Sequence, residues 1–255
     1  MTIDRDVSLI VPVHHCNGSL ARLLDACGRY LDSMQGSCEL LLVDDHGTDP
    51  RASATLERFA LRESVRLLRN DRNRGKGYSV KRGMLAARGR YRVFTDADLA
   101  YPLAEITNIV AALQQGAHVA AACRALPQSQ SEASAPPHEL RYVFTRRVMS
   151  RAFNRLVRLT LLPGVLDTQA GLKGYTAAAA RAVFSRVTIP GFGFDLECLF
   201  VARRLGLRVV QVPVRFRHDA VNTTVRFVRD AVTMTSDLAR IRWRALNGEY
   251  EAARR

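Results

Sequence analysis

Short runs of strand-forming apolar residues alternate along this chain with segments whose apolar residues recur at helical spacing. The runs at 8–13 (SLIVPV) and 39–43 (ELLLV) are apolar at nearly every position, which is typical of strands buried on both faces. Between them, Leu20, Leu23 and Leu31 lie on one stripe of a helix. This alternation predicts an α/β fold with a mostly parallel central sheet and helices on both faces.

The pattern continues towards the C-terminus. A helix beginning at Pro50 is expected to be capped by Asp49 or Thr48, and a helix beginning at Pro102 carries Glu105 in its first turn. Further strands are expected at 65–68, 91–95, 118–122, within 167–175, and at 208–216. Further helices are expected from the end of the polar loop 70–77 to about 87, and at 141–162, 177–184, within 192–205, and 222–246.

The charge of the chain is strongly positive, with a net charge of +14 over 255 residues. Such a balance indicates an anionic partner, namely nucleic acid, a phosphorylated substrate or an anionic membrane surface. The chain has no helix-turn-helix, RNP or zinc motif, and aromatic residues make up only 7%, so we do not expect a nucleic-acid partner.

The cysteines and the hydropathy indicate where the protein works. Five widely spaced cysteines without a C-x-x-C pair argue against a disulfide framework and favour a reducing compartment. Neither a signal peptide nor an apolar run of about 20 residues is visible. We therefore expect a cytoplasmic protein, with peripheral attachment to the inner face of the membrane as an open alternative.

Carboxylates follow two of the expected strands. Asp44 and Asp45 end the second strand, and Asp96 and Asp98 follow the strand at 91–95. Ligands of parallel sheets bind outside the carboxyl ends of the strands, so these side chains are expected to converge. Two carboxylates one residue apart suit Mg²⁺ or Mn²⁺, which prefer oxygen ligands and share them with substrate phosphates. The pattern D-x-D is weak by itself, because it also occurs at 4–6.

Seven motifs that follow one another between residues 7 and 217 carry a family resemblance. They are Val11-Pro12-Val13, Leu42-Val43-Asp44-Asp45 with Asp49, Asn73-Arg74-Gly75-Lys76-Gly77, Asp96-Ala97-Asp98-Leu99, Asp167-Thr168-Gln169 with Gly171 and Lys173, Gly193-Phe194-Asp195-Leu196-Glu197, and Val212-Pro213-Val214. The set resembles family 2 glycosyltransferases of the GT-A fold, a Rossmann-like α/β fold. It is most similar to enzymes that make polyprenyl-phosphate sugars, and the segments 73–77 and 167–173 are similar to the dolichyl-phosphate glucosyltransferase branch, which uses UDP-glucose.

The resemblance implies roles for individual residues. Asp96 and Asp98 would hold Mg²⁺ or Mn²⁺, Asp98 and Asp195 would be catalytic, and Asp45 would hydrogen-bond the base. Gly75 and Gly77 would let the backbone approach phosphate closely. The residues expected to bind the nucleotide-sugar donor or the acceptor are Pro12, Val13, His14, Asp45, Arg74, Lys76, Thr95, Asp96, Ala97, Arg124 and Lys173.

The chain departs from the family pattern at several of these motifs. Cys16 stands where a carboxylate usually contacts ribose, Ala100 where some relatives have a polar third metal contact, and Ala170 where the glucosyl branch tends to carry Cys. Metal affinity is therefore expected to depend on two carboxylates, the substrate and water. These departures leave a specialised sugar or acceptor, or a nucleotide-binding relative without catalysis, as alternatives.

The expected division of the chain is a glycosyltransferase domain at 1–217 and a basic amphipathic helix within 218–255. The domain would comprise a nucleotide-sugar half at 7–124, a mobile loop at 125–140 and an acceptor half at 141–217. The arginines of 138–160, Arg217 and Arg226 would bind a lipid phosphate. The final helix would either lie on an anionic membrane or pack its apolar stripe on the domain.

The expected reaction is an inverting transfer of a hexose from a nucleotide-sugar to an acceptor. A polyprenyl or dolichyl phosphate is already anionic and needs no strong base. A hydroxyl acceptor would need one, and Asp195 is the candidate. The sequence leaves the sugar, the base and the oligomeric state open.

Overall fold

The structure is a computed structural model that describes residues 6–14, 19–34, 37–47, 49–132, 155, 157–217 and 227–251, without the side chains of 227–232 and 234. Its strands are β1 (Val7–Val13), β2 (Cys38–Asp44), β3 (Val65–Arg69), β4 (Tyr91–Thr95), β5 (Val119–Ala122), β6 (Gln130–Ser131), β7 (Leu172–Thr176), β8 (Val209–Val212) and β9 (Arg215–Phe216). Its helices are α1 (Leu20–Ser33), α2 (Pro50–Phe59), α3 (Lys76–Ala86), α4 (Glu105–Gln114), α6 (Ala177–Phe184), α7 (Phe194–Arg204) and α8 (Phe227–Leu246).

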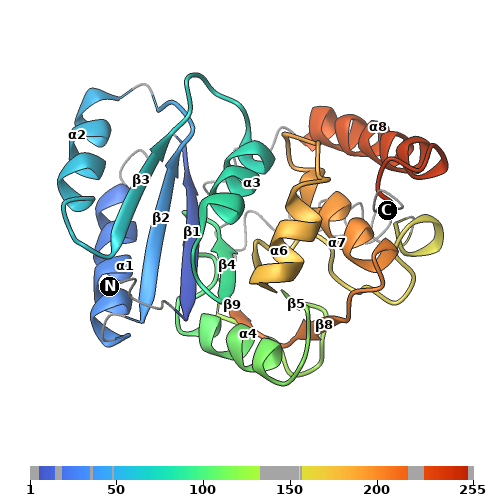
Figure 1. Cartoon of the computed structure of the whole chain (residues 1–255), viewed down its shortest axis with the longest axis horizontal. Helices are drawn as coiled ribbons and strands as arrows, with labels where there is room; N and C mark the ends of the chain where they lie inside the picture. Colours follow the sequence, from blue (N-terminus) through green and yellow to red (C-terminus); the bar gives the residue numbers. More distant parts are fainter. Residues whose placement is uncertain are drawn as a thin grey trace, which may run out of the picture.

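A seven-stranded sheet in the order β3-β2-β1-β4-β7-β5-β8 forms the centre of the molecule (Figure 1). Its strand pairs are parallel except for those of β7, which runs antiparallel to both β4 and β5. The mostly parallel sheet predicted from the alternating pattern is confirmed. The antiparallel β7 brings its own amino end to the edge where the parallel strands have their carboxyl ends, because Leu172 pairs with Thr95.

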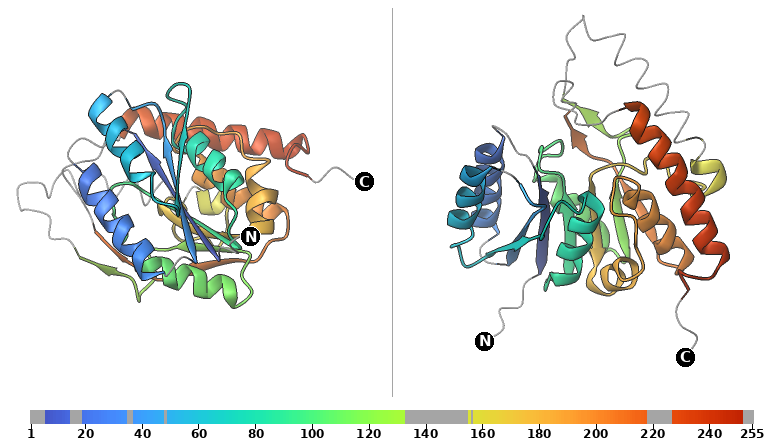
Figure 2. Two further views of the ribbon diagram at one scale, coloured as in Figure 1. Left: turned by 60° about the vertical axis from the view of Figure 1, so that its left-hand side comes forward. Right: turned by 90° about the horizontal axis from the view of Figure 1, so that it is seen from above.

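Helices cover both faces of the sheet, as predicted. One hydrophobic cluster joins the sheet to α1, α2 and α4, and the other joins it to α3, α6, α7 and α8. Figure 2 shows α1 and α2 on one side of the strands and α3, α6, α7 and α8 on the other. Local chemistry fixes the start of α2: the carboxylate of Asp49 accepts from the amide of Arg51 at 2.9 Å, and Pro50 occupies the first turn.

The single strand expected at 208–216 is wrong. The segment forms two strands, β8 paired with β5 and β9 paired with β6. Pro213 stands between them and has no N–H to continue a ladder. The next amide, Val214 N, donates to Ser129 Oγ at 3.1 Å, so the chain turns towards β6. β6 itself lies within the segment expected to be a loop; of that segment, 133–140 lies outside the described residues.

The final helix packs part of its apolar stripe on the domain. Leu238 and Ile241 are buried in the same cluster as α6 and α7, and Ala245 packs against it. Arg240 and Arg242 are exposed. None of the described helices has the length and apolar run needed to cross a bilayer. The boundary at 217/218 stays a prediction, and residues 222–226 lie outside the described part of the chain.

Candidate functional site

The carboxyl edge of the sheet gathers most of the residues singled out from the sequence. Asp45 follows β2, Asp96 follows β4, and Arg124 comes two residues after β5. Lys173 lies near the amino end of antiparallel β7 and pairs with Phe94 of β4. Pro12 and Val13 end β1, partly buried and buried respectively, in register with Val43 and Asp44.

A tight turn after β4 presents the two carboxylates. Leu99 has a φ of 57°, a left-handed conformation that costs energy for a residue with a side chain and is common at functional sites. The Ala100 amide donates to Asp98 Oδ1 at 2.9 Å, and the Leu99 amide donates to the Asp96 carbonyl at 3.4 Å. Asp96 is partly buried and Asp98 is exposed, so the turn places one carboxylate inside the site and the other at its rim. Ala97 between them is partly buried.

The carboxylate of Asp96 packs against Gly171 of the 167–173 motif. A Cβ added to Gly171 would overlap the carboxylate of Asp96, so only glycine allows this approach. Thr95 Oγ1 and Asp96 Oδ1 are both buried and have no hydrogen-bond partner among the described residues. Unpartnered buried polar atoms are rare in folded proteins and are found at binding sites.

Lys76, the first residue of α3, supplies a positive charge next to Asp96. Its Nζ lies 2.6 Å from Asp96 Oδ1 and forms an ion pair with it. The rings of Phe192 and Phe194 lie 5.8 and 5.7 Å from the same nitrogen. Burial lowers the pKa of Lys76, but the carboxylates of Asp96, Asp195 and Asp98 outweigh it and raise the pKa overall. Lys76 is therefore a fixed cation.

The acidic pair fits a metal ion that is shared with a substrate. Within the described residues, no group of three or more His, Cys, Asp and Glu side chains is placed to hold a metal. Asp96 Oδ1 is a buried carboxylate oxygen that the Lys76 ammonium contacts, so a bound cation would share this carboxylate with Lys76. Asp96 and Asp98 would therefore hold Mg²⁺ or Mn²⁺ only together with substrate phosphates and water.

Asp45 anchors the loop that precedes α3. Its Oδ1 accepts from Asn70 Nδ2 at 2.7 Å and from the Arg74 amide at 2.8 Å, and its Oδ2 accepts from the Gly75 amide at 2.7 Å. His14 donates through Nδ1 to the Asp45 carbonyl at 3.1 Å. Three of the four lone-pair positions of the carboxylate are thus occupied by the protein, which leaves one for the base contact that the resemblance implies.

The glycines of this loop pack against the protein's own backbone. A Cβ on Gly75 would lie 2.5 Å from Pro190 O, and one on Gly77 would lie 2.5 Å from Ile189 O. The Arg74 guanidinium is bound by Asp71 at 2.9 Å and lies over the ring of Tyr78.

A buried ion pair lies behind the acidic turn. Lys173 is fully buried, and its Nζ lies 2.5 Å from Asp195 Oδ1 and donates to the Ala170 carbonyl at 2.7 Å. Burial raises the pKa of Asp195, and the ammonium groups of Lys173 and Lys76 oppose that rise only in part. The pair joins β7 to α7.

Arg124 and Asp167 form a second pair at the same edge. Arg124 donates through two nitrogens to the buried Asp167 carboxylate, at 2.7 and 3.0 Å. Burial alone would raise the pKa of Asp167, but the bonds from Arg124 hold it below its ordinary value. Arg217 lies near the turn, because its amide donates to the Ala100 carbonyl at 2.7 Å, while its guanidinium pairs with Glu132. Arg226 and most of 138–160 lie outside the described residues.

The sequence interpretation missed two residues of this region. Tyr101 is 3% exposed, and its hydroxyl has no partner among the described residues. A tyrosine between the acidic turn and Pro102 was the available signal. Glu197 lies in the first turn of α7, where it is fully buried and accepts four hydrogen bonds. Its partners are distant in sequence, so no local pattern indicates them.

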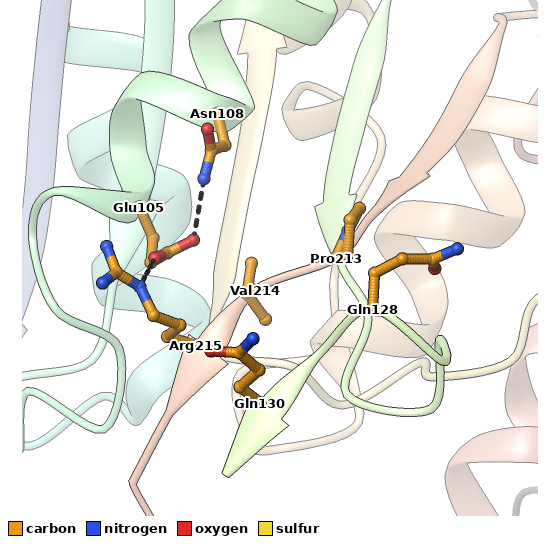
Figure 3. Close-up of a pocket in the computed structure, with 7 residues that line it drawn as sticks. All are labelled: Glu105, Asn108, Gln128, Gln130, Pro213, Val214 and Arg215. Atoms are coloured by element: carbon orange, nitrogen blue, oxygen red, sulfur yellow. Dashed lines mark hydrogen bonds and ion pairs between the residues drawn. The ribbon is translucent and has the colours of Figure 1, made fainter. Parts of the chain in front are cut away.

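A pocket of about 360 Å³ lies elsewhere, between α4 and the β6–β9 pair (Figure 3). Glu105 in its wall is bound by Arg215 and Asn108, each at 2.9 Å. None of the residues expected to bind the donor, the acceptor or the metal lines this pocket, and its one buried carboxylate is bound by the two side chains just named. We therefore place the functional site at the acidic turn.

Comparison with known proteins shows which family the chain resembles. The family model described as glycosyl transferase family 2 matches residues 8–184. Dolichyl-phosphate beta-glucosyltransferase of Dictyostelium discoideum is 28% identical, over 96% of this chain and 76% of its own length. The protein of the same name from Drosophila melanogaster is 31% identical, over 83% of this chain and 67% of its own.

A solved structure has the same fold. Glucosyl-3-phosphoglycerate synthase from Mycobacterium tuberculosis, crystallised with Mn²⁺, UDP-glucose and phosphoglyceric acid, superposes with a TM-score of 0.67 at 19% identity. The superposition covers 93% of this chain and 79% of that one. The family model spans the strands that carry the acidic turn, so the chain is a glycosyltransferase and belongs to glycosyl transferase family 2.

Proposed function

We propose that this enzyme transfers glucose from UDP-glucose to a polyprenyl or dolichyl phosphate, with inversion at the anomeric carbon and with Mg²⁺ or Mn²⁺. The ion pair of Lys76 and Asp96 carries the proposal, because it sets a fixed cation beside a partly buried carboxylate at the carboxyl edge of the sheet. The names of the Dictyostelium and Drosophila relatives support glucose and the lipid phosphate. UDP-glucose and Mn²⁺ in the mycobacterial structure support the donor and the metal.

The chemistry follows from the charges around Asp96. Negative charge grows on the diphosphate as the glycosidic bond breaks, and a bound divalent cation would neutralise part of it. Lys76 adds a second positive charge, and the rings of Phe192 and Phe194 limit its hydration. Asp98 at the rim is exposed and can meet a cation that arrives with the donor.

The acceptor decides whether a base is needed. A phosphate monoester attacks as an anion, and Arg217 beside the acidic turn is a suitable partner for it. The second candidate is a hydroxyl acceptor with Asp195 as base. The raised pKa of Asp195 favours that role, whereas its burial at 3% exposure and its bond to Lys173 oppose it.

A thermal-shift panel of UDP-, GDP- and dTDP-sugars tests the donor. We expect UDP-glucose with Mn²⁺ to raise the Tm most, because binding to the folded state stabilises it. Transfer of labelled glucose to a short polyprenyl phosphate then tests the acceptor. Stabilisation by GDP-mannose alone, or transfer only to hydroxyl acceptors, would contradict the proposal.

Two variants sharpen the assignment. Asp96→Asn removes the charge that faces Lys76 and should abolish Mn²⁺-dependent binding of UDP-glucose. Asp25→Asn is the matched control, since Asp25 is 61% exposed on α1 and pairs with Arg29. Turnover of Asp195→Asn, assayed where it stays folded, distinguishes the acceptors: near-normal turnover excludes an obligate base, and a hydroxyl acceptor with it.

A further inference from the structure

We propose that Glu197 and Tyr250 are positioning residues for the sugar-nucleotide site, which act through the 188–191 segment on Lys76; this rests on the function proposed above. Both lie beyond the stretch 8–184 that the family model matches. The geometry that carries the proposal is a series of contacts that runs from Tyr250, in the turn after α8, to the acidic turn.

Glu197 is the centre of the series. It is fully buried in α7, and its Oε2 accepts from the amides of Thr188 and Ile189, each at 2.8 Å. Its Oε1 accepts from the Thr188 hydroxyl at 3.0 Å and from the Tyr250 hydroxyl at 2.7 Å. All four lone-pair positions of the carboxylate are thus used, so Glu197 links the 188–189 backbone to Tyr250 in the turn after α8.

The 188–191 segment in turn holds the start of α3. The first amides of a helix have no partner within it, and the cap residue Gly75 has no side chain to supply one. Pro190 O takes that place, because it accepts from Gly77 N at 2.7 Å and from Tyr78 N at 3.3 Å. The carbonyls of Ile189 and Gly191 lie over Gly77 and leave no room for a side chain there.

Lys76 depends on this arrangement. It is the first residue of α3, and its Nζ is the group that meets Asp96 at 2.6 Å. The aromatic rings beside it, Phe192 and Phe194, directly continue the 188–191 segment. A shift of that segment would therefore move both the helix that carries the ammonium and the rings that flank it.

Two residues of α8, Arg244 and Asp237, contact the 188–193 stretch at two further points. The Arg244 guanidinium bonds Thr188 Oγ1, lies over the Tyr250 ring at 5.3 Å and pairs with Glu249 at 2.8 Å. The carboxylate of Asp237 in α8 fills the space over Gly193, where any Cβ would overlap it. α8 and the turn after it thus contact both ends of the 188–193 stretch.

Removing the Tyr250 hydroxyl should weaken donor binding more than turnover. If the 188–191 segment is less firmly held, a smaller fraction of the enzyme is ready to bind, and the apparent Kd rises in inverse proportion to that fraction. We expect Tyr250→Phe to raise the Kd for UDP with Mn²⁺ about tenfold, because this factor corresponds to the free energy of one hydrogen bond to a charged group. The KM for UDP-glucose should rise in proportion while kcat changes little.

Tyr30→Phe is the control, because it removes a hydroxyl from α1 on the opposite face of the sheet. Calorimetry with UDP and Mn²⁺ gives the Kd, and thermal unfolding shows that each variant is folded. An unchanged Kd in a folded Tyr250→Phe variant overturns the inference alone. A wild-type enzyme that does not bind UDP overturns the proposed function, and this inference with it.

Hydrogen exchange on the wild type tests the coupling without a variant. Coupling between two sites is reciprocal, so a ligand that favours the ordered 188–191 segment must also stabilise the contacts that hold it. We expect UDP with Mn²⁺ to slow amide exchange several-fold across 244–250, on the far side of Glu197 from Lys76. Unchanged exchange in that stretch, with UDP bound, would falsify the proposal.

Discussion

Lys173 and Asp195 illustrate at the residue scale how one buried pair constrains the experiments. Asp195→Asn leaves the Lys173 ammonium fully buried without a counter-charge. We expect a loss of about 3–5 kcal/mol in the free energy of unfolding, measured by urea denaturation. Adding Lys173→Met to the same chain should recover most of it, because no buried charge then remains. A single variant as stable as wild type would show that the pair is not closed in solution.

The residues of the site were predictable where a motif carries its own chemistry. Asp96 and Asp98 follow a strand, so their place at the carboxyl edge follows from the class of fold. The roles of Asp45, Gly75 and Gly77 could not be derived in this way. Asp45 binds a loop that lies 25 to 30 residues later, and the glycines pack against a segment more than 100 residues away.

At the scale of elements, the local sequence pattern predicts where a helix or strand begins and ends, but not the order of the strands in the sheet. β4 and α6 begin and end at the predicted residues, because apolar periodicity and flanking polar residues decide where an element stops. The insertion of antiparallel β7 between β4 and β5 depends on partners far away in sequence, and no local signal specifies it. Pro213 was a visible signal for the break between β8 and β9, because proline cannot continue a ladder.

At the amino edge of the sheet, remote from the acidic turn, the carboxylate of Glu39 links β1, β3 and the segment before β4. Glu39 at the start of β2 accepts from Ser8 Oγ and from the Arg88 amide, each at 2.6 Å, and pairs with Arg66 at 3.3 Å. Burial raises the pKa of Glu39, but these three donors outweigh it and lower the pKa below its ordinary value. Such a group contributes stability above its unfolded pKa of about 4.3, and loses it as the pH falls through its folded pKa.

We therefore expect the unfolding free energy of the wild type to fall below about pH 4. Glu39→Gln should cost about 1–3 kcal/mol at pH 7, because the amide cannot accept as many bonds. The variant should also show a shallower loss in acid, and urea unfolding between pH 3 and 7 measures both effects. Its Kd for UDP serves as the internal control and should match wild type. Equal acid slopes for the two proteins would refute the role given to Glu39.

At the scale of the whole molecule, the two ends of the chain differ in what the sequence could indicate. The N-terminal half follows a repeating strand–helix pattern, which predicts its layers correctly. The C-terminal stripe left two outcomes open, because a basic amphipathic helix suits both a membrane and a domain surface. The structure buries Leu238 and Ile241 on the domain, yet leaves Trp243 62% exposed beside Arg242.

That exposed face of α8 makes the last prediction specific. A lipid acceptor requires contact with a membrane, and a net charge of +14 favours an anionic one. We expect the protein to bind vesicles that contain anionic lipid, and we expect salt to reverse this binding because it screens the attraction.

Leu246→Ser should weaken vesicle binding about tenfold, since a leucine that enters the interface contributes about 1.5–3 kcal/mol. Leu61→Ser is a matched control, because both leucines are 85% exposed but Leu61 lies beyond α2. Fluorescence of Trp243, the single tryptophan, should shift to the blue on binding. Equal effects of the two substitutions would mean that α8 does not face the lipid.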